Sequence, residues 1–244
     1  MDRLKWIAMF GMMALLLTAV ADDALAQRRG GGGQPKQLPP GFTPYLEASA
    51  TYGSMWGGNI DLNYYSINSR TIRTGTGPSY AFALAYNLHP MQAVEFSYTR
   101  QEGSLDMDYK GLRTLTDMSV NFWHIGSIRY LAPPGKVRPF VLASLGATYF
   151  SPEEGSFLLD EEDPDTLVFT QTSTKFSFNF GLGVKSYFGK AEKVGIRATF
   201  KVLPTFYNTW GGMYFGSGGA GLTVSGNAIW QWEAAIGLTV KLGG

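Results

Sequence analysis

The chain has 244 residues, of which 45% are hydrophobic, 14% are aromatic and only 16% are charged, and its formal net charge is +1. This composition excludes a disordered tail protein, because the chain can build an apolar core, and it disfavours a nucleic-acid binder, which needs a basic surface. The absence of Cys excludes disulfides, thiolate metal sites and cysteine nucleophiles. The 31 Gly residues amount to nearly twice the average share of about 7%, and with the many aromatics they favour β structure.

The first 26 residues have the pattern of a secretory signal peptide. Arg3 and Lys5 precede the apolar run 6–20, and Ala24-Leu25-Ala26 forms a small-residue cleavage motif. The apolar run is shorter than the roughly 20 residues of a transmembrane helix. We therefore expect export with cleavage rather than an uncleaved anchor. Residues 27–41, rich in Gly and Pro, are predicted to form a flexible periplasmic linker.

From residue 42 onward, apolar and polar residues alternate with period two, which is typical of strands and not of helices. The alternation is clearest in three segments, 175–185, 195–202 and 230–242. Weaker alternation predicts five more strands near residues 44–53, 78–87, 93–101, 118–131 and 137–150. In segment 118–131, His124 falls on the same side as Val120 and Phe122, so we expect a β-bulge there.

Short and long connections alternate strictly between these eight strands. The short ones are 88–92, 132–136 and 189–193, and the long ones are 54–77, 102–117, 151–174 and 203–228. On each strand, bulky apolar residues lie on one side, and small, polar or charged residues lie on the other. Together these features predict an all-β, eight-stranded antiparallel up-and-down transmembrane β-barrel over residues 42–244. It would lie in the bacterial outer membrane, with both termini in the periplasm.

Aromatic residues near the strand ends, among them Tyr130 and Tyr187, are expected to form the girdles at the two membrane interfaces. The alternative to a membrane barrel is a soluble lipocalin-like barrel, which also has eight strands. A soluble barrel would turn its large apolar face inward, and it would have to enclose residues such as Phe178 and Trp232. The signal sequence, the unequal connections and the bulky apolar sides favour the membrane barrel.

Two segments resemble the outer membrane protein A-like eight-stranded β-barrel family. They are Val137-Arg138-Pro139-Phe140-Val141 with Gly146, and the closing Trp230-Gln231-Trp232-Glu233. The resemblance covers about residues 42–242 and implies a barrel in contact with outer-membrane lipid and lipopolysaccharide. Many members end on an aromatic residue that the barrel insertion machinery reads, whereas this chain ends Lys241-Leu242-Gly243-Gly244.

Charged residues on the polar sides of the strands are predicted to face the barrel interior and to form a network of ion pairs. Buried charges need partners, and an eight-stranded interior is only wide enough to be filled by side chains. We therefore expect a plug that holds the barrel together, with a gated pore as the alternative. The predicted network consists of Glu47, Glu95, Arg129, Lys185, Arg197, Lys201 and Glu233.

Two of the long connections are candidate surfaces for an extracellular ligand or a host surface. The connection 151–174 is acidic and could hold Ca²⁺ or Mg²⁺, although a solvated acidic loop is the simpler interpretation; its residues include Glu161, Glu162, Asp163 and Asp165. No residue between Val202 and Trp232 is charged. That segment either binds sugar, lipid or protein through exposed aromatics, or is a hairpin that extends the last two strands; its aromatics include Phe206, Tyr207, Trp210, Tyr214 and Phe215.

Catalytic signals are weak. The two histidines, His89 and His124, are not placed beside a Ser and a carboxylate at the outer rim, as a lipid A-modifying barrel enzyme would require. No phosphate loop, dinucleotide fingerprint or metal-binding His cluster is present. We predict a non-enzymatic monomer without a cofactor, with a structural or surface-interaction role. A narrow pore or transporter for small or hydrophobic solutes is the first alternative, and a lipid A-modifying enzyme is the second.

Overall fold

The computed structural model describes residues 42–63, 69–109, 112–152, 173–189, 191–216 and 219–242. The predicted signal peptide and linker, residues 1–41, lie outside the described residues. The ten strands are β1 Tyr45–Gly57, β2 Asn59–Asn63, β3 Ser69–Thr74, β4 Gly77–His89, β5 Gln92–Tyr109, β6 Leu112–Tyr130, β7 Val137–Pro152, β8 Ser173–Phe188, β9 Val194–Gly216 and β10 Gly219–Leu242. Within these ranges, no helix has the length and apolarity that a membrane span needs.

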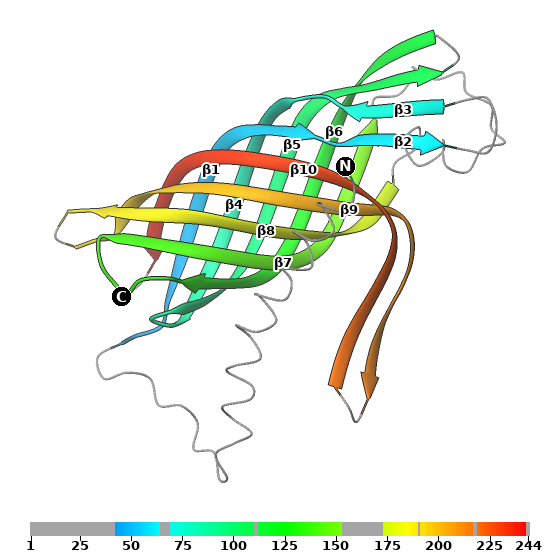
Figure 1. Ribbon diagram of the computed structural model, residues 1–244. Helices are drawn as coiled ribbons and strands as arrows, with labels where there is room; N and C mark the ends of the chain where they lie inside the picture. The colour runs from blue at the N-terminus through cyan, green and yellow to red at the C-terminus, as the bar shows by residue number, and fades with distance from the viewer. Residues whose placement is uncertain are drawn as a thin grey trace. The chain divides into compact units, whose positions relative to one another are not determined.

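Eight of these strands form a closed antiparallel barrel (Figure 1). They pair in the order β1-β4-β5-β6-β7-β8-β9-β10, and β10 pairs back with β1. The other two strands, β2 and β3, form a hairpin that continues β1 and β4 beyond the barrel, and β3 also pairs with β5. Closure supplies the hydrogen-bond partners that hydrocarbon cannot offer to a free sheet edge. The prediction of an eight-stranded up-and-down barrel is confirmed.

The register of the strands sets the width of the barrel. We start at Trp56 on β1 and move from each residue to its ladder partner on the next strand. After one circuit of the barrel this path returns to β1 at Leu46, so the strands are offset by ten residues per circuit. Eight strands with such an offset are tilted by roughly 35–45° from the barrel axis, and they leave an interior just wide enough for side chains. Side chains from strands on opposite walls can therefore meet.

Large apolar side chains cover the outside of the wall. Phe82 on β4 and Ile236 on β10 are each 60% exposed, while their neighbours Ala81 and Ala235 are buried on the inside. Comparable residues face outward on the other strands, among them Phe96, Ile125, Leu145, Leu182, Ile196 and Tyr52. A continuous apolar surface of this extent is unfavourable in water and matches the lipid-facing band of a membrane barrel. The transmembrane barrel is thereby favoured over the lipocalin-like alternative.

The predicted bulge in β6 is absent. β6 pairs with β5 and β7 without a register shift, and Val120, Phe122 and His124 are all buried on the inner side. The prediction failed because it assumed a polar interior, whereas this part of the interior is apolar. Tyr130 and Tyr187 are also buried inside the barrel, with 1% and 2% of their surfaces exposed, and do not belong to an interface girdle.

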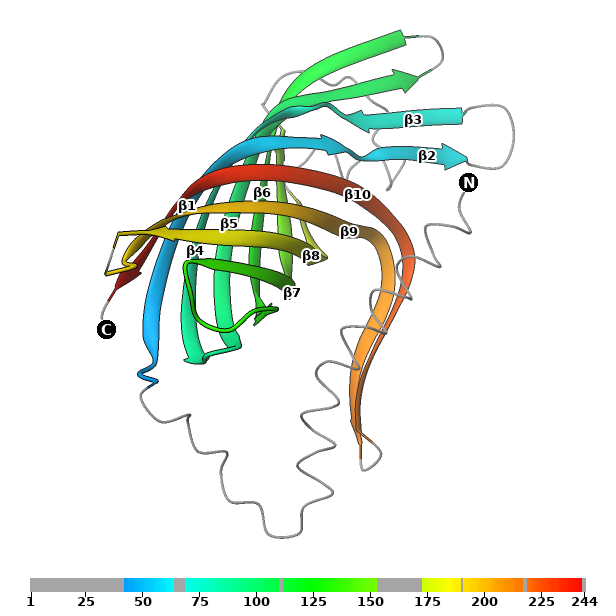
Figure 2. The same cartoon turned by 60° about the vertical axis from the view of Figure 1, so that its left-hand side comes forward.

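Much of the sequence predicted as long loops is strand. β5 and β6 pair as far as Tyr109 and Leu112, and β9 and β10 pair as far as Gly216 and Gly219. The charge-free segment is therefore a hairpin that extends β9 and β10, which is the second of the two interpretations offered above. Figure 2 shows these two strands running on together past the rim of the barrel.

We expect an outward charge at mid-wall to destabilise the barrel in lipid. Replacing Ile236 by Arg should lower the free energy of unfolding by about 2–4 kcal/mol, and replacing Leu242 by Arg, at the end of β10, by about 0–1 kcal/mol. Guanidinium titration of tryptophan fluorescence in lipid vesicles measures both. Equal, small effects at the two positions would contradict a lipid-facing wall.

Candidate functional site

The two ends of the barrel differ. The first and last barrel residues, Tyr45 and Leu242, lie at the same end of the barrel as the three short turns (Figure 1). We call this end of the barrel the turn end. At the opposite end, which we call the hairpin end, the strands are extended by hairpins. The interior between these ends is the candidate site, because it gathers most of the charged residues predicted to interact.

A hydrogen-bonded network crosses the interior near the turn end. The carboxylate of Glu47 accepts hydrogen bonds from the Lys185 ammonium, with which it forms an ion pair, and from the Tyr187 hydroxyl. The same ammonium donates to the Tyr130 hydroxyl at 3.0 Å, and that hydroxyl donates to Asn87 Oδ1 at 2.9 Å. Side chains from β1, β4, β6 and β8 are thus joined in one buried network.

Arg138 on β7 closes the interior at the turn end. Its guanidinium donates to the Tyr45 hydroxyl at 3.0 Å and to the carbonyl oxygen of Pro90 in the β4–β5 turn. The guanidinium carbon also lies 3.5 Å from the centre of the Tyr130 ring, a cation–π contact. Lys241 makes a similar contact, its ammonium 4.1 Å from the centre of the Tyr187 ring. Through Arg138, the β4–β5 turn is connected to strands β1, β6 and β7.

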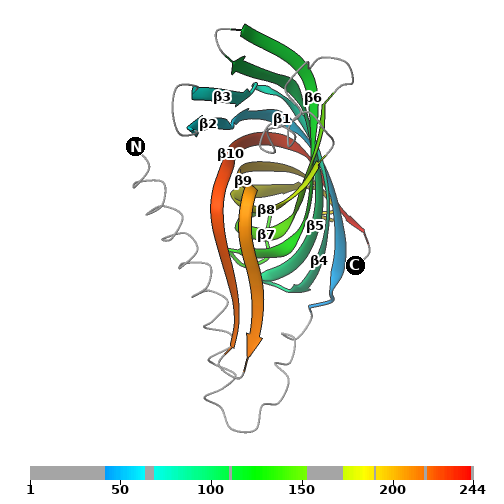
Figure 3. The same cartoon turned by 90° about the vertical axis from the view of Figure 1, so that its right-hand side faces the viewer.

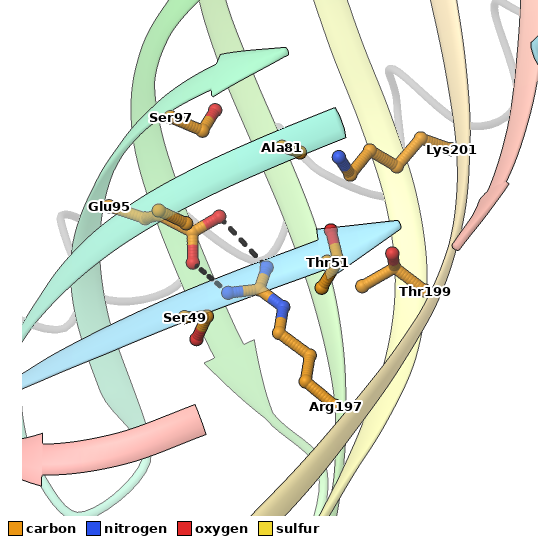
Figure 4. A pocket seen from close by; sticks show the side chains of 9 residues that line it. Ser49, Thr51, Ala81, Glu95, Ser97, Arg197, Thr199 and Lys201 are labelled. Atoms are coloured by element: carbon orange, nitrogen blue, oxygen red, sulfur yellow. Dashed lines mark hydrogen bonds and ion pairs between the residues drawn. The ribbon is translucent and has the colours of Figure 1, made fainter. Parts of the chain in front are cut away.

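A second bridge spans the middle of the barrel. Arg197 on β9 donates two hydrogen bonds to the carboxylate of Glu95 on β5, at 2.5 and 2.9 Å, as Figure 4 shows. β5 and β9 are four strands apart in both directions around the barrel, so this pair crosses its full width. Next to it, the Lys201 ammonium lies 2.6 Å from a carboxylate oxygen of Glu233 on the neighbouring β10.

A small polar cavity adjoins the Glu95–Arg197 pair (Figure 4). It has room for about one water molecule. Hydroxyl and small side chains from four strands line it together with the charged groups, namely Ser49, Thr51, Ala81, Ala83, Ser97 and Thr199. The cavity is a local space within a filled interior.

Apolar side chains fill the interior toward the hairpin end, which the sequence did not predict. The layer consists of fully buried residues from five strands, Met55, Val120, Phe122, Phe150, Leu203 and Ile229. Two polar contacts cross the same region. Gln231 Nε2 donates to Gln101 Oε1 at 2.6 Å, and the hydroxyls of Thr148 and Thr205 lie 2.9 Å apart. The interior is therefore filled at both ends as well as at its middle.

His124 forms a pair that the sequence analysis missed. Its Nε2 atom lies 3.0 Å from the Ser177 hydroxyl on β8. Gly146 on β7 stands between them in the ladder, and the absence of a side chain there lets the two groups meet. Both residues are buried. Among the side chains that the structure describes, no carboxylate hydrogen-bonds to His124, so the orienting group of a catalytic triad is missing from this pair.

The structure brings six of the seven predicted interior charges together as three ion pairs. Arg129 is the exception and corrects the prediction: its side chain is exposed on the outer side of β6, close to the turn end. Because β6 has no bulge, odd-numbered residues in this part of the strand face outward. A long Arg side chain at this position can reach the headgroup layer of a membrane.

The predicted loop surface has three different outcomes. Phe206 is only 5% exposed, because it packs against Phe176 and Phe178 at ring-centre distances of 6.4 and 5.9 Å; this corrects its prediction as a surface residue. The backbone of Tyr207, Trp210, Tyr214 and Phe215 belongs to β9. The acidic residues Glu161, Glu162, Asp163 and Asp165 lie outside the described residues.

Several interior residues were missed because their partners are far away in sequence. Tyr130 and Tyr187 were assigned to the girdles, and Gln101 and Gln231 carry no charge that would draw attention. The signal that could have found them is their place on the inward side of their strands, combined with the register of the closed barrel. The register becomes available only with the structure.

The sequence matches no protein-family model and no curated protein. Solved structures of similar fold include two with TM-scores of 0.50 or more. The outer membrane protein OprG from Pseudomonas aeruginosa has a TM-score of 0.51 and 10% identity, covering 82% of this chain and 96% of that chain. The chain has the fold of the eight-stranded outer-membrane β-barrels. The outer membrane protein AlkL has a TM-score of 0.50 and 13% identity over 88% and 98% of the two chains, and Neisserial surface protein A has 0.48 and 17% over 82% and 97%.

We expect the Glu95–Arg197 pair to stabilise the barrel only as a pair. Replacing Glu95 alone by Leu should lower the free energy of unfolding by about 3–5 kcal/mol, because it leaves the buried guanidinium without its counter-charge. Adding Arg197→Met should restore most of the loss. Equilibrium unfolding in vesicles measures both variants.

The matched control is the ion pair between Arg100 and Glu102, in which Arg100 Nε lies 3.3 Å from Glu102 Oε1. Both side chains are about half exposed. Replacing Glu102 by Gln should change the stability by less than about 1 kcal/mol. A Glu95→Leu variant as stable as this control would show that the central bridge contributes nothing to holding the barrel together.

Proposed function

We propose that this chain is a non-enzymatic protein of the Gram-negative outer membrane whose barrel serves as a closed scaffold. The turn end faces the periplasm, and the hairpin end projects from the cell, where it interacts with an extracellular ligand or a host surface. The signal-peptide pattern and the apolar outer wall support this location. In this role the barrel holds the extended hairpins of β2–β3, β5–β6 and β9–β10 at fixed positions on the cell surface.

The filled interior is the observation that carries the proposal. Glu47–Lys185, Glu95–Arg197 and Gln101–Gln231 each join strands that are not neighbours in the barrel, and they do so at three successive heights. An ion or solute crossing the barrel would have to break all three contacts and pass the apolar layer around Phe122. A pore needs a continuous path, so the arrangement favours the scaffold over the transporter.

The proposed partners follow from the surfaces of the barrel. Outer-membrane lipid and lipopolysaccharide surround the apolar wall, and the barrel insertion machinery places it there. A closed barrel satisfies its own strand edges and needs no second copy to do so, which supports a monomer. The buried state of the His124–Ser177 pair supports a non-enzymatic role, because a lipid substrate would not reach the hydroxyl.

The test is the electrical conductance of the refolded chain, residues 27–244, in a planar lipid bilayer. We expect a folded barrel, recognised by its heat-dependent mobility on a gel, that produces no discrete current steps. The Arg197→Ala variant should be equally silent, because the network at Glu47 and the apolar layer still close the interior.

Discrete steps in the wild-type chain that change in the Arg197→Ala variant would contradict the scaffold and would establish a pore past the central ion pair. The enzyme alternative has its own measurement, the mass of lipid A extracted from cells that express the chain. Modified lipid A that disappears on replacing Ser177 by Ala would overturn the non-enzymatic proposal.

A further inference from the structure

β9 and β10 continue as a two-stranded ribbon beyond the strands that flank them. The ladder between β8 and β9 ends at Ser177 and Thr205, and the ladder between β1 and β10 ends at Gly57 and Gln231. Further out, residues 208–216 and 219–227 pair with each other in the described part of the chain. We call this pair of segments the ribbon. Figure 3 shows it curving away from the barrel wall.

The ribbon is uncharged and has two unlike faces. The register pairs Met213 with Leu222, Phe215 with Ala220, and Gly211 with Val224, and residues that alternate along a strand share a face. These six residues therefore share one face with Thr209 and Gly226, which pair at its start, and the face is apolar except at Thr209. The opposite face carries residues that combine polar and aromatic character, among them Asn208, Trp210, Tyr214, Thr223 and Ser225.

The apolar face of the ribbon is continuous with the lipid-facing wall of the barrel. Even-numbered residues of β10 face outward in the barrel, as Ile236 and Leu238 do, and β10 runs on without an interruption to Leu222. On β9 the exposed residues in the barrel, such as Ile196 and Phe200, are also even-numbered. The register then shifts, because Ala228 pairs with Phe206 while Asn227 pairs with Asn208.

The register shift leaves Tyr207 as an extra residue on β9, a β-bulge that changes which positions of β9 share a face with the even-numbered positions of β10. Beyond the bulge, the odd-numbered positions 213 and 215 share that face with positions 220 and 222. Without it, the outward face of β9 would carry Trp210 and Tyr214 opposite the apolar residues of β10. The bulge thus produces a single apolar face at the point where the ribbon leaves the wall.

We propose that the ribbon lies on the outer leaflet of the membrane, with its apolar face against the lipid. This inference rests on the proposed location of the barrel in a membrane. An isolated two-stranded hairpin is marginally stable in water, so an uncovered apolar face needs an apolar surface beside it. Lipid already contacts the adjoining wall, and 29 consecutive uncharged residues, from Leu203 to Gln231, offer no charge that would resist such contact.

The ribbon would rest at the interface and not enter the hydrocarbon. Among the described residues, no neighbouring strand pairs with its two outer edges along residues 208–216 and 219–227, and unpaired backbone groups require water or headgroups as partners. Tyr and Trp on the opposite face suit the same layer, where aromatic side chains with a polar group are enriched. The ribbon is therefore a surface element beside the barrel that contacts lipid over one face.

The chain contains no Cys, so single cysteines can report on each face of the ribbon. Met213→Cys and Leu222→Cys place a fluorescent label on the apolar face, and Thr223→Cys and Ser225→Cys place it on the other face one or a few residues away. The labelled chains are refolded in phosphatidylcholine vesicles. Quenching is measured with lipids that carry a nitroxide near the headgroup and, separately, with iodide in the water.

We expect lipid-borne nitroxide to quench the labels at 213 and 222 several-fold more than those at 223 and 225, and iodide to show the reverse order. Equal quenching at all four positions would overturn the inference. So would shielding of the label at residue 213 from both quenchers together with a disulfide between two unlabelled Met213→Cys chains under an added oxidant, because the apolar face would then be covered by a second copy.

A control separates this inference from the proposed location of the barrel. A label at Ile236→Cys, on the lipid-facing wall, should be quenched by the lipid nitroxide whatever the ribbon does. If that label is quenched while those at 213 and 222 respond to iodide alone, the ribbon inference is wrong and the barrel location stands. If the label at 236 also responds to iodide alone, the barrel is not in the membrane and both proposals fail.

Discussion

The closed ladder of eight strands, offset by ten residues, is the constraint on which the rest of the structure depends. Closure satisfies the backbone hydrogen bonds that lipid cannot satisfy, and the offset fixes the tilt and so the width of the interior. At that width, a side chain from one wall reaches the opposite wall, as Arg197 and Glu95 do. The interior is filled as a consequence, because large inward side chains on facing strands share a space of this width.

Close packing of the interior also requires small residues at chosen positions. A methyl group added at Gly183 on β8 would lie 2.5 Å from the nearest atom of the Phe140 ring on the neighbouring β7, so the absence of a side chain makes room for that ring. At Gly146 a methyl group would meet the backbone of Trp123 and His124 on the neighbouring β6, so this position also requires the absence of a side chain. The high Gly content of the chain thus reflects, in part, how large and small residues share a narrow interior.

Alternation along the sequence was sufficient to predict the eight barrel strands and most of their inward and outward sides, because a strand exposes its two sides to two different media. Together with the alternating short and long connections, it also predicted the closed barrel. Alternation could not show which inward residues lie at the same height, since that depends on the register between strands distant in sequence. Glu47 and Lys185 could be predicted to face the interior, yet their contacts with Tyr130 and Tyr187 could not. The sides of Arg129 and His124 were misjudged for one reason: polarity was used to assign the sides of β6, whereas Arg129 faces outward, and Val120 and Phe122 face inward beside His124.

The same alternation links the wall of the barrel to the ribbon. Along β10, the even-numbered positions remain apolar from Leu238 to Leu222, well past the point where β1 ceases to pair with the strand. A solvated loop would not require an apolar residue at every second position of residues 222–228. Nor would it require the β-bulge in β9 that places positions 213 and 215 on the same face. A membrane surface accounts for both features, because it extends the lipid-facing environment of the wall sideways along the ribbon. If the ribbon belongs to the membrane-contacting surface, as we propose, an extracellular partner would bind its opposite face and the remaining hairpins.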